Sequence, residues 1–207
     1  MEPTTRDLNL LFVRHGATAW TETGRYQGRQ DTALSADGQR DAARLAEQLR
    51  GQPIGLVLSS PLTRARDTAA PIAAVTGARL TIDKRLVELG YGEWEGLTQT
   101  EVKAAWPAEL RRWKRNPETA RRAGGETLAE ARARLDDLLA DLDGRAAPER
   151  TVALVTHDIV IRLALLAALG AGLDGLRGLT VPPASAHPMR LRAGRLLPPN
   201  TEQAADV

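Results

Sequence analysis

The stretch Leu8–Gly16 reads LNLLFVRHG, a short apolar run that stops at an arginine, a histidine and a glycine. Two later stretches have the same form: Gly55–Leu58 leads into Ser59–Arg64, and Thr151–Thr156 ends at His157-Asp158. Short apolar runs that are bounded by polar or turn-forming residues and followed by helical patterns are typical of strands in a parallel sheet. The predicted fold class is therefore α/β.

Basic and imidazole side chains stand where these three runs end. Arg14 and His15 follow the first run, Arg64 lies shortly after the second, and His157 follows the third. In open α/β sheets, ligands bind in the crevice outside the carboxyl ends of the strands. We therefore expect these side chains to face one crevice. Guanidinium forks combined with imidazoles suit a tetrahedral dianion, most simply a phosphoryl group.

The chain has 207 residues, a formal net charge of +2 and an ordinary proportion of hydrophobic side chains. This length suffices for a sizeable core, and we predict a single domain over residues 1–197 followed by a C-terminal tail at 198–207. The absence of cysteine excludes disulfides, thiolate catalysis and cysteine-ligated metals. The sequence has no apolar signal core and no membrane-spanning run, so we expect a cytoplasmic protein without a membrane partner.

Capping residues and apolar spacing predict four helices. They cover residues 35–50, 61–76, 127–142 and 159–169. Ser35 is the expected N-cap of the first helix, and Thr127 opens a capping box in the third. The second is expected to have Pro61 as its first helical residue, which places Arg64 near an anion-favouring helix N-terminus. The fourth is apolar nearly all round, so it should be buried.

The remaining segments are predicted to contain two strands, a loop and an excursion. Arg79–Ile82 is typical of a short strand and Met189–Leu191 of an edge strand. Leu86–Gly96 is punctuated by glycine and should be a loop in the wall of the crevice. Residues 98–125, in which two prolines interrupt helical pieces, are expected to form a cap over the active site.

Phosphoryl transfer by a histidine requires a neutral imidazole, cationic donors for the equatorial oxygens and an acid for the leaving alkoxide. His15 is the candidate nucleophile, because it stands at a strand end before Gly16, where the backbone can approach a phosphate. Arg14, Arg64 and His157 are the candidate donors.

Glu88 is the candidate acid because it lies in the loop that should form the crevice wall. A nearby phosphate dianion would raise the pKa of Glu88 and keep its carboxyl protonated until it is needed. Glu93 and Glu95, in the same loop, are the alternatives for this role. His187 is interpreted as a surface or structural histidine rather than a participant.

Five motifs, in order and in spacing, resemble the histidine phosphatase superfamily, which includes the cofactor-dependent phosphoglycerate mutases. They are Phe12–Thr18, Tyr26–Gly28 with Leu34-Ser35, Ser59–Ala65, Leu86–Glu88 with Gly92–Gly96, and Val155–His157. A lone Arg-His-Gly triplet is weak support, whereas five motifs in register over about residues 8 to 192 are specific.

This resemblance implies a three-layer α/β/α fold with a mostly parallel central sheet, and a metal-independent phosphomonoesterase without a cofactor. It implies a phosphohistidine intermediate on His15, phosphate held by Arg14, Arg64 and His157, and proton transfer by Glu88. A small phosphorylated metabolite is the expected substrate and a homodimer the expected assembly.

Further substrate contacts are expected from Thr21, Gln27, Gly28 and Asp158. Many relatives carry asparagine where this chain has Thr21, whose single hydroxyl predicts a weaker or water-mediated contact with phosphate. Many relatives carry glycine where this chain has Asp158. A carboxylate beside a phosphate is unfavourable unless it points away or pairs, for example with an arginine.

The choice between phosphatase and mutase depends on what reaches the phosphohistidine next. Mutases of the superfamily carry a longer excursion with a Tyr-Gly-Gly-Leu-Thr-Gly-Leu-Asn type of run. Here Tyr91–Thr98 reads YGEWEGLT, which resembles the phosphatase branch, so water is the expected acceptor. A phosphoglycerate mutase primed by 2,3-bisphosphoglycerate and a non-catalytic phospholigand-binding domain are the alternatives. Sugar phosphates, phosphoglycerate, α-ribazole phosphate and phosphoserine are all consistent substrates.

A basic cluster consists of Arg111, Arg112, Lys114, Arg115, Arg121 and Arg122. Nucleic-acid binding of single strands uses a stacking platform of several aromatic side chains, and Trp113 is the one aromatic residue interleaved here. We therefore predict a solvated rim and no nucleic-acid partner. A second interpretation is that some of these guanidinium groups steer anionic substrates into the crevice.

Overall fold

The computed structural model describes residues 7–144 and 151–199, and within them the strands form one sheet in the order β3-β2-β4-β1-β5-β6. They are β1 (Leu8–Arg14), β2 (Ile54–Ser59), β3 (Arg79–Ile82), β4 (Thr151–Thr156), β5 (Ala186–Arg192) and β6 (Arg195–Leu197). The pairs β1–β4, β2–β4 and β2–β3 are parallel, whereas β5 is antiparallel to both of its neighbours. The predicted strands over the three apolar runs and over Arg79–Ile82 are confirmed. The predicted tail lies outside the described residues from residue 200 onward.

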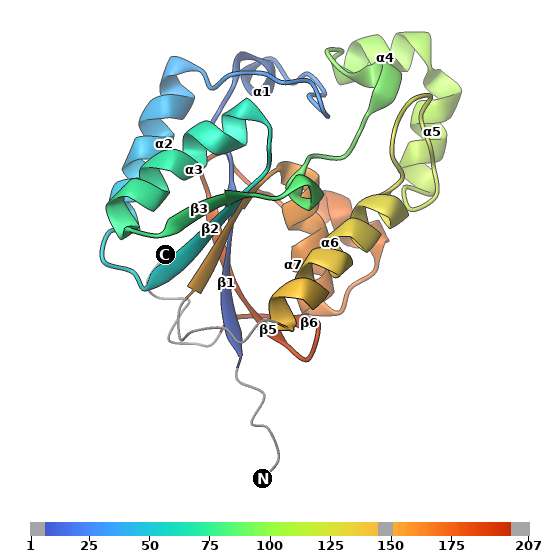
Figure 1. The fold of residues 1–207 in the computed structure, drawn as a ribbon. Coiled ribbons are helices and arrows are strands. Elements are labelled where there is room, and N and C mark those ends of the chain that lie inside the picture. The colour runs from blue at the N-terminus through green and yellow to red at the C-terminus, as the bar shows by residue number, and fades with distance from the viewer. Residues whose placement is uncertain (1–6, 145–150, 200–207) are drawn as a thin grey trace.

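Helices cover both faces of this sheet (Figure 1). They are α2 (Ala36–Gln48) and α3 (Thr63–Thr76) on one face, and α6 (Leu128–Asp143) and α7 (Asp158–Leu169) on the other. Successive side chains of β1 alternate between two cores. Leu10 and Phe12 pack on the α6–α7 side, and Leu11 and Val13 pack on the α2–α3 side. The three-layer α/β/α fold with a mostly parallel sheet is confirmed.

Local capping explains where two of these helices begin. Ser35 accepts the N–H of Gly38 at 3.1 Å and begins α2. Thr127 and Glu130 form the predicted capping box of α6, with the hydroxyl accepting the Glu130 N–H at 3.2 Å. Both helices therefore begin where side chains nearby in sequence satisfy their unpaired N–H groups.

The predicted start of α3 at Pro61 is wrong, because the helix begins at Thr63. Its cap comes from elsewhere in the chain: Asp31 accepts the Thr63 N–H at 2.6 Å and the Thr63 hydroxyl at 2.9 Å. A carboxylate at a helix N-terminus also complements the helix dipole. Arg64 still lies in the first turn, as predicted.

The predicted position of Met189–Leu191 at the sheet edge is wrong. These residues belong to β5, which pairs with β1 on one side and with β6 on the other. The turn into β6 contains Ala193 and Gly194, with φ of 47° and 72°. Two positive φ values are the geometry of a tight hairpin turn, which adds one more strand. The strands β3 and β6 form the sheet edges within the described residues.

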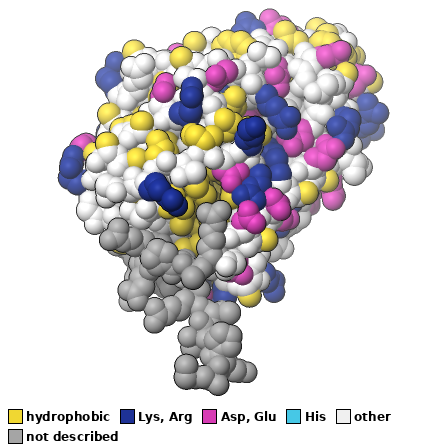
Figure 2. All heavy atoms as spheres, in the orientation of Figure 1, with side chains coloured by type: hydrophobic (Ala, Val, Ile, Leu, Met, Phe, Trp, Pro, Cys, Tyr) yellow, Lys and Arg dark blue, Asp and Glu magenta, His cyan; other side chains and the backbone are white. Residues whose placement is uncertain are grey.

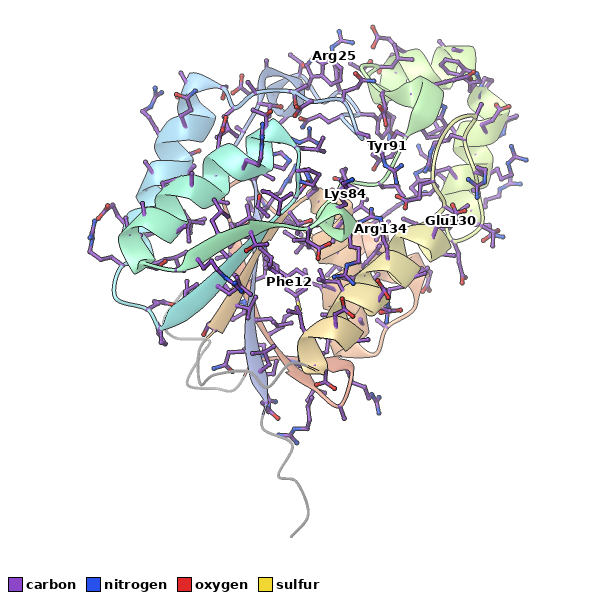
Figure 3. All side chains as sticks on the ribbon, viewed as in Figure 1. Phe12, Arg25, Lys84, Tyr91, Glu130 and Arg134 are labelled. Atoms are coloured by element: carbon purple, nitrogen blue, oxygen red, sulfur yellow. The ribbon has the colours of Figure 1, made fainter. Side chains whose placement is uncertain are left out.

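Residues 98–125 contain α4 (Gln99–Ala105) and α5 (Pro107–Arg115), which stand away from the sheet at the upper right of Figure 1. Arg25 ties this segment to the chain after β1, because its guanidinium donates to the carbonyl of Gly96 at 2.7 Å and to Glu101 at 3.0 Å. Figure 3 shows Arg25 beside α4. The remaining short elements are α1 (Ala19–Glu22) and the 3₁₀ turns η1 (Lys84–Leu86), η2 (Gly92–Trp94) and η3 (Leu173–Gly178). Every helix in residues 7–144 and 151–199 is too short or too polar to span a membrane.

Candidate active site

The carboxyl ends of β2, β4 and β1 meet because these three strands are neighbours in the sheet. The N–H of His15 donates to the carbonyl of Thr156 at 3.1 Å, and the N–H of Ser60 donates to that of Val155 at 2.9 Å. These bonds continue the ladder past the strand ends and hold the polar segments side by side. The structure thus brings together the three segments that the sequence places at one crevice.

A cavity of about 240 Å³ opens at this place. It is lined by Arg14, His15, Thr21, Gly24, Arg25, Tyr26, Gln27, Gly28, Arg64, Glu88, Tyr91 and Asp158. His157 is fully buried next to this lining, with its ring centroid 5.1 Å from that of His15. No histidine side chain is visible on the face of the molecule that Figure 2 shows.

His15 is held as a neutral imidazole with a defined tautomer. It is 2% exposed, and its Nδ1 lies 2.7 Å from the carbonyl oxygen of Gly16. Because a carbonyl only accepts, Nδ1 carries the proton and Nε2 carries the lone pair. Burial, together with the charges of Arg64 and Arg14, lowers the pKa of His15 well below its ordinary value. Nε2 is therefore a base with a free lone pair at neutral pH.

The two arginines bring buried guanidinium donors to the site. Arg64 is fully buried and donates to the carbonyls of Gly28 at 2.8 Å and Gln30 at 2.7 Å. This burial lowers the pKa of Arg64 to about 10. Arg14 donates to the carbonyl of Val181. Within the described residues, the Nε atoms of both arginines are buried without a hydrogen-bond partner. Buried cationic groups with unfilled donors favour an anion in the cavity.

Glu88 is a carboxyl group that keeps its proton close to neutral pH. It is 6% exposed, and burial, together with the charge of Asp158, raises its pKa to about 7. Its Oε1 accepts the N–H of Leu89 at 2.8 Å, which fixes the orientation of the carboxyl group. This combination of position and proton affinity suits a general acid.

The alternative acids lie outside the cavity wall. Glu93 is exposed, and one carboxylate oxygen of Glu95 accepts the N–H groups of Arg29 and Tyr91, each at 3.0 Å. His187, also outside the wall, is partly buried with Nε2 at 2.8 Å from the hydroxyl of Ser185. The geometry therefore favours Glu88 as the acid.

Asp158 does not face the cavity as an unpaired carboxylate. Its oxygens lie 3.4 Å from Arg14 and 3.0 Å from Arg162. This is the pairing with arginine that a carboxylate beside a phosphate site requires. Its charge still reaches the neighbouring carboxyl group, because Asp158 contributes to the raised pKa of Glu88.

Thr21 lies in the cavity wall, but its hydroxyl hydrogen is already used. Thr18 Oγ1 donates to Gln27 Oε1 at 3.0 Å, so Thr21 must be the donor in the 3.0 Å pair between the two threonine hydroxyls. Gln27 Nε2 donates to Thr21 Oγ1 at 3.0 Å, and its second amide hydrogen is left for a ligand. Gln27 is therefore a better donor in this wall than Thr21.

The family model of the histidine phosphatase superfamily (branch 1) matches residues 10–197. The chain belongs to the histidine phosphatase superfamily. Phosphoserine phosphatase 1 of Hydrogenobacter thermophilus is 34% identical over 167 residues, which are 81% of this chain and 79% of that protein. The structure of a mycobacterial glucosyl-3-phosphoglycerate phosphatase in complex with VO3 is similar with a TM-score of 0.78 and 33% identity, over 88% of this chain and 90% of the other. A probable phosphoglycerate mutase of Yersinia enterocolitica is 34% identical over 193 residues, 89% of this chain and 81% of the relative.

Four wall residues of this histidine phosphatase lie outside the predicted site: Gly24, Arg25, Tyr26 and Tyr91. Tyr91 follows Glu88 by three residues in the same loop, so its position is a consequence of that loop entering the wall. Figure 3 shows Tyr91 between α4 and the centre of the molecule. The sequence gives no such signal for Arg25, because its position is fixed by hydrogen bonds to Gly96 and Glu101, which are far away in the sequence.

The prediction of a solvated rim is wrong for Arg122. This side chain is 3% exposed, and its guanidinium lies 4.2, 5.0 and 5.4 Å from the ring centroids of Trp113, Tyr91 and Trp94. Tyr91 and Trp94 come from the loop Leu86–Gly96 and Trp113 from α5, and the three rings of the histidine phosphatase form a cation–π cage. Across residues 7–144 and 151–199, no three His, Cys, Asp or Glu side chains are grouped so that they could hold a metal ion.

Proposed function

We propose that the chain is a phosphomonoesterase that transfers the phosphoryl group of its substrate first to Nε2 of His15 and then to water. One observation carries the proposal: the lone pair of His15 Nε2 lies in a cavity with two guanidinium groups whose buried Nε donors are unfilled. A nucleophile beside unfilled cationic donors is the arrangement that phosphoryl transfer needs. The relatives named as phosphatases support this reaction class.

The reaction has two steps. In the first, Nε2 of His15 bonds to phosphorus while the bond between phosphorus and the alcohol oxygen breaks, and Glu88 gives its carboxyl proton to that oxygen. In the second, the Glu88 carboxylate takes a proton from water as the water oxygen attacks phosphorus and the phosphorus–nitrogen bond breaks. Arg14, Arg64 and His157 donate hydrogen bonds to the phosphoryl oxygens in both steps.

The alcohol part of the substrate has a place beside the phosphate cavity. A second cleft of about 370 Å³ adjoins it and shares wall residues with it, among them Tyr91 and Asp158. Lys114, Arg115 and Arg177 line this cleft and are exposed. These cations favour an alcohol that carries a carboxylate. Phosphoserine and glucosyl-3-phosphoglycerate, named for two relatives, both combine a phosphate ester with a carboxylate.

Phosphate release from a panel of phosphomonoesters, measured in EDTA for the wild type and His15→Ala, tests the reaction. We expect metal-independent release that is lost in the variant. The panel includes 3-phosphoglycerate with and without 2,3-bisphosphoglycerate. Isomerisation without release would identify a mutase, and inactivity on every substrate would leave a phospholigand-binding domain.

Charge reversal in the second cleft tests the substrate class. Arg177→Glu should raise KM for phosphoserine about tenfold more than KM for p-nitrophenyl phosphate, which has no carboxylate. Lys103→Glu reverses an exposed lysine of α4 outside the cleft and serves as the matched control. Equal changes in KM for both substrates would contradict this place for the alcohol.

We also propose a cytoplasmic location, a homodimer and no nucleic-acid partner. Light scattering of the purified protein tests the dimer, and a monomeric mass would contradict it. A heparin column and binding to defined single strands test the absence of a nucleic-acid partner. We expect the protein to be retained on heparin only at low salt and not to bind the single strands, because its basic surface only steers small anions.

A further inference from the structure

Ser60 and His157 form a buried pair beside the cavity. The Ser60 Oγ lies 2.8 Å from the Nε2 of His157, and both residues are fully buried. Ser60 follows β2 directly, and its N–H donates to the carbonyl of Val155 in β4 at 2.9 Å. The pair is therefore anchored to two of the strands that assemble the site.

The hydroxyl hydrogen of Ser60 has one acceptor within reach. Oγ accepts the N–H of Leu62 at 3.3 Å, and the Nε2 of His157 is its other partner in the described residues. If Nε2 carried the proton, Oγ would accept both bonds and its own hydrogen would be buried without an acceptor. The Nδ1 of His157, which is buried without a partner, would then be an unsatisfied acceptor as well.

The opposite arrangement leaves one unsatisfied group instead of two. When Ser60 donates to Nε2, the proton of the neutral ring is on Nδ1, and only this N–H lacks a partner. Burial and the charge of Arg64 lower the pKa of His157, so the ring is neutral and carries one proton. The His157 ring centroid lies 5.1 Å from that of His15 in the cavity wall, so a phosphoryl oxygen bound at His15 would be the acceptor for this N–H.

We propose that Ser60 is a positioning residue that holds His157 as its Nδ1–H tautomer and thereby makes it a hydrogen-bond donor to the phosphoryl group. This inference rests on the proposed function, because it needs His157 to contact phosphoryl oxygens. Both site histidines then carry their proton on Nδ1, but they offer different atoms to the substrate. Gly16 uses the Nδ1–H of His15 and leaves its Nε2 lone pair, whereas Ser60 uses the Nε2 of His157 and leaves its Nδ1–H.

The tautomer can be measured directly, because the chain has 3 histidines. Two-bond ¹H–¹⁵N correlation spectra of the ¹⁵N-labelled wild type distinguish a protonated from an unprotonated ring nitrogen. His15→Gln and His187→Gln each remove one set of signals and so assign the third. We expect a protonated Nδ1 and an unprotonated Nε2 for His157. A protonated Nε2, or a mixture of both tautomers, in the wild type overturns the proposal.

Serine variants test whether Ser60 causes the tautomer. Ser60→Ala should move the His157 proton to Nε2 or to a mixture, and Ser60→Thr, which keeps a hydroxyl, should preserve Nδ1–H. Ser59→Ala is the matched control, because Ser59 is equally buried and its hydroxyl donates to the backbone carbonyl of Ser60 at 2.9 Å, not to the His157 ring. An unchanged tautomer in folded Ser60→Ala would show that Ser60 does not set it.

Kinetics supply a second readout. A histidine in the wrong tautomer can cost up to about 10⁴ in rate in a serine protease, and we expect a smaller loss of about tenfold to hundredfold in kcat for Ser60→Ala, with KM changed less. Ser59→Ala should retain the wild-type kcat, and Ser60→Thr should recover most of it. The spectra do not depend on turnover. Inactivity of the wild type together with an Nδ1–H His157 would refute the proposed function while leaving the serine–histidine arrangement in place.

Discussion

At the scale of single residues, the site depends on which groups burial keeps neutral. Burial disfavours the charged form of every titratable group, so it lowers the pKa of His15 and raises that of Glu88. The imidazole is thereby left with its lone pair, and the carboxyl group with its proton. Asp158 acts in the same direction on Glu88, which gives this unusual side chain a part in tuning the acid.

The first prediction concerns Glu88 as the acid. Glu88→Gln should lower kcat for alkyl phosphates by about 10²–10⁴-fold, because the amide has no proton to give. The loss should be much smaller for p-nitrophenyl phosphate, whose leaving group needs little protonation. In the wild type, kcat/KM for alkyl phosphates should fall above about pH 7 as Glu88 ionises. Equal losses for both substrates would argue for a role other than proton donation.

The second prediction concerns Asp158. Asp158→Asn removes a negative charge that raises the pKa of Glu88, so that pKa should fall and the alkaline limb of the pH–rate profile should move to lower pH. KM should also fall, because Arg14 loses its 3.4 Å ion pair and is freed for phosphate. Asp143→Asn, a change at an exposed carboxylate of α6 outside both clefts, is the control. A limb at the wild-type pH in Asp158→Asn would contradict the coupling.

The third prediction links Glu88 to stability. Its pKa rises from an ordinary value of 4.5 to about 7 on folding, so the native state binds more protons between these values. Stability from the protonated carboxyl is therefore present below about pH 4.5 and lost as pH rises through about 7. As pH rises from about 4.5 to above about 7, the free energy of unfolding of Glu88→Gln should increase relative to that of the wild type by up to about 3 kcal/mol. Urea unfolding of both proteins at several pH values measures the difference, in which the histidine contributions cancel. A difference that is independent of pH would contradict the assignment.

At the scale of elements, α6 and α3 contrast a local cap with a distant one. Thr127 and Glu130 cap α6 within four residues, whereas α3 depends on Asp31, which is 32 residues away from Thr63. The start of α3 matters for function, because Arg64 lies in its first turn and must reach the cavity. The loop that carries Asp31 thus helps to place a phosphate-binding guanidinium.

The fourth prediction compares these caps. Thr127→Ala and Asp31→Ala should each lower the free energy of unfolding by about 1–2 kcal/mol, measured in urea. Only Asp31→Ala should also raise KM, because it loosens the turn that contains Arg64. A KM change of the same size in Thr127→Ala would show that general destabilisation is the cause.

At the scale of the whole molecule, three sheet strands and both helical layers converge on one anion site. Filling that site should therefore stabilise the entire fold, because the ligand binds the native state alone. Inorganic phosphate at about 100 times its Kd should add about 2.7 kcal/mol and raise Tm by roughly 5–10 °C. His15→Ala, which keeps both arginines, should show a similar shift.

Chloride at the same ionic strength is the control for this fifth prediction, and it should leave Tm nearly unchanged. A shift of equal size in chloride would reflect ionic strength rather than a phosphate site.

Much of the fold could be predicted from the sequence because the signals for it are local. Leu8–Arg14 and Thr151–Thr156 are apolar runs of strand length, and Ser35 and Thr127 cap helices within a few residues of themselves. The motif residues could be predicted to form one site because neighbouring parallel strands end at one edge of a sheet. The predicted start of α3 was wrong by two residues, but the prediction that Arg64 lies in the first turn of this helix was still correct.

By itself, the sequence determined the α/β layering, the crevice, and the set of histidines, arginines and glutamate that meets there. Only the tertiary structure decided that β5 is an interior strand, that Asp31 caps α3, and that Arg122 is enclosed by three rings. It also decided the tautomer of His15 and the proton affinity of Glu88. The reason is physical: periodicity and caps act over a few residues, whereas burial, pairing and charge are set by atoms that folding brings from distant parts of the chain.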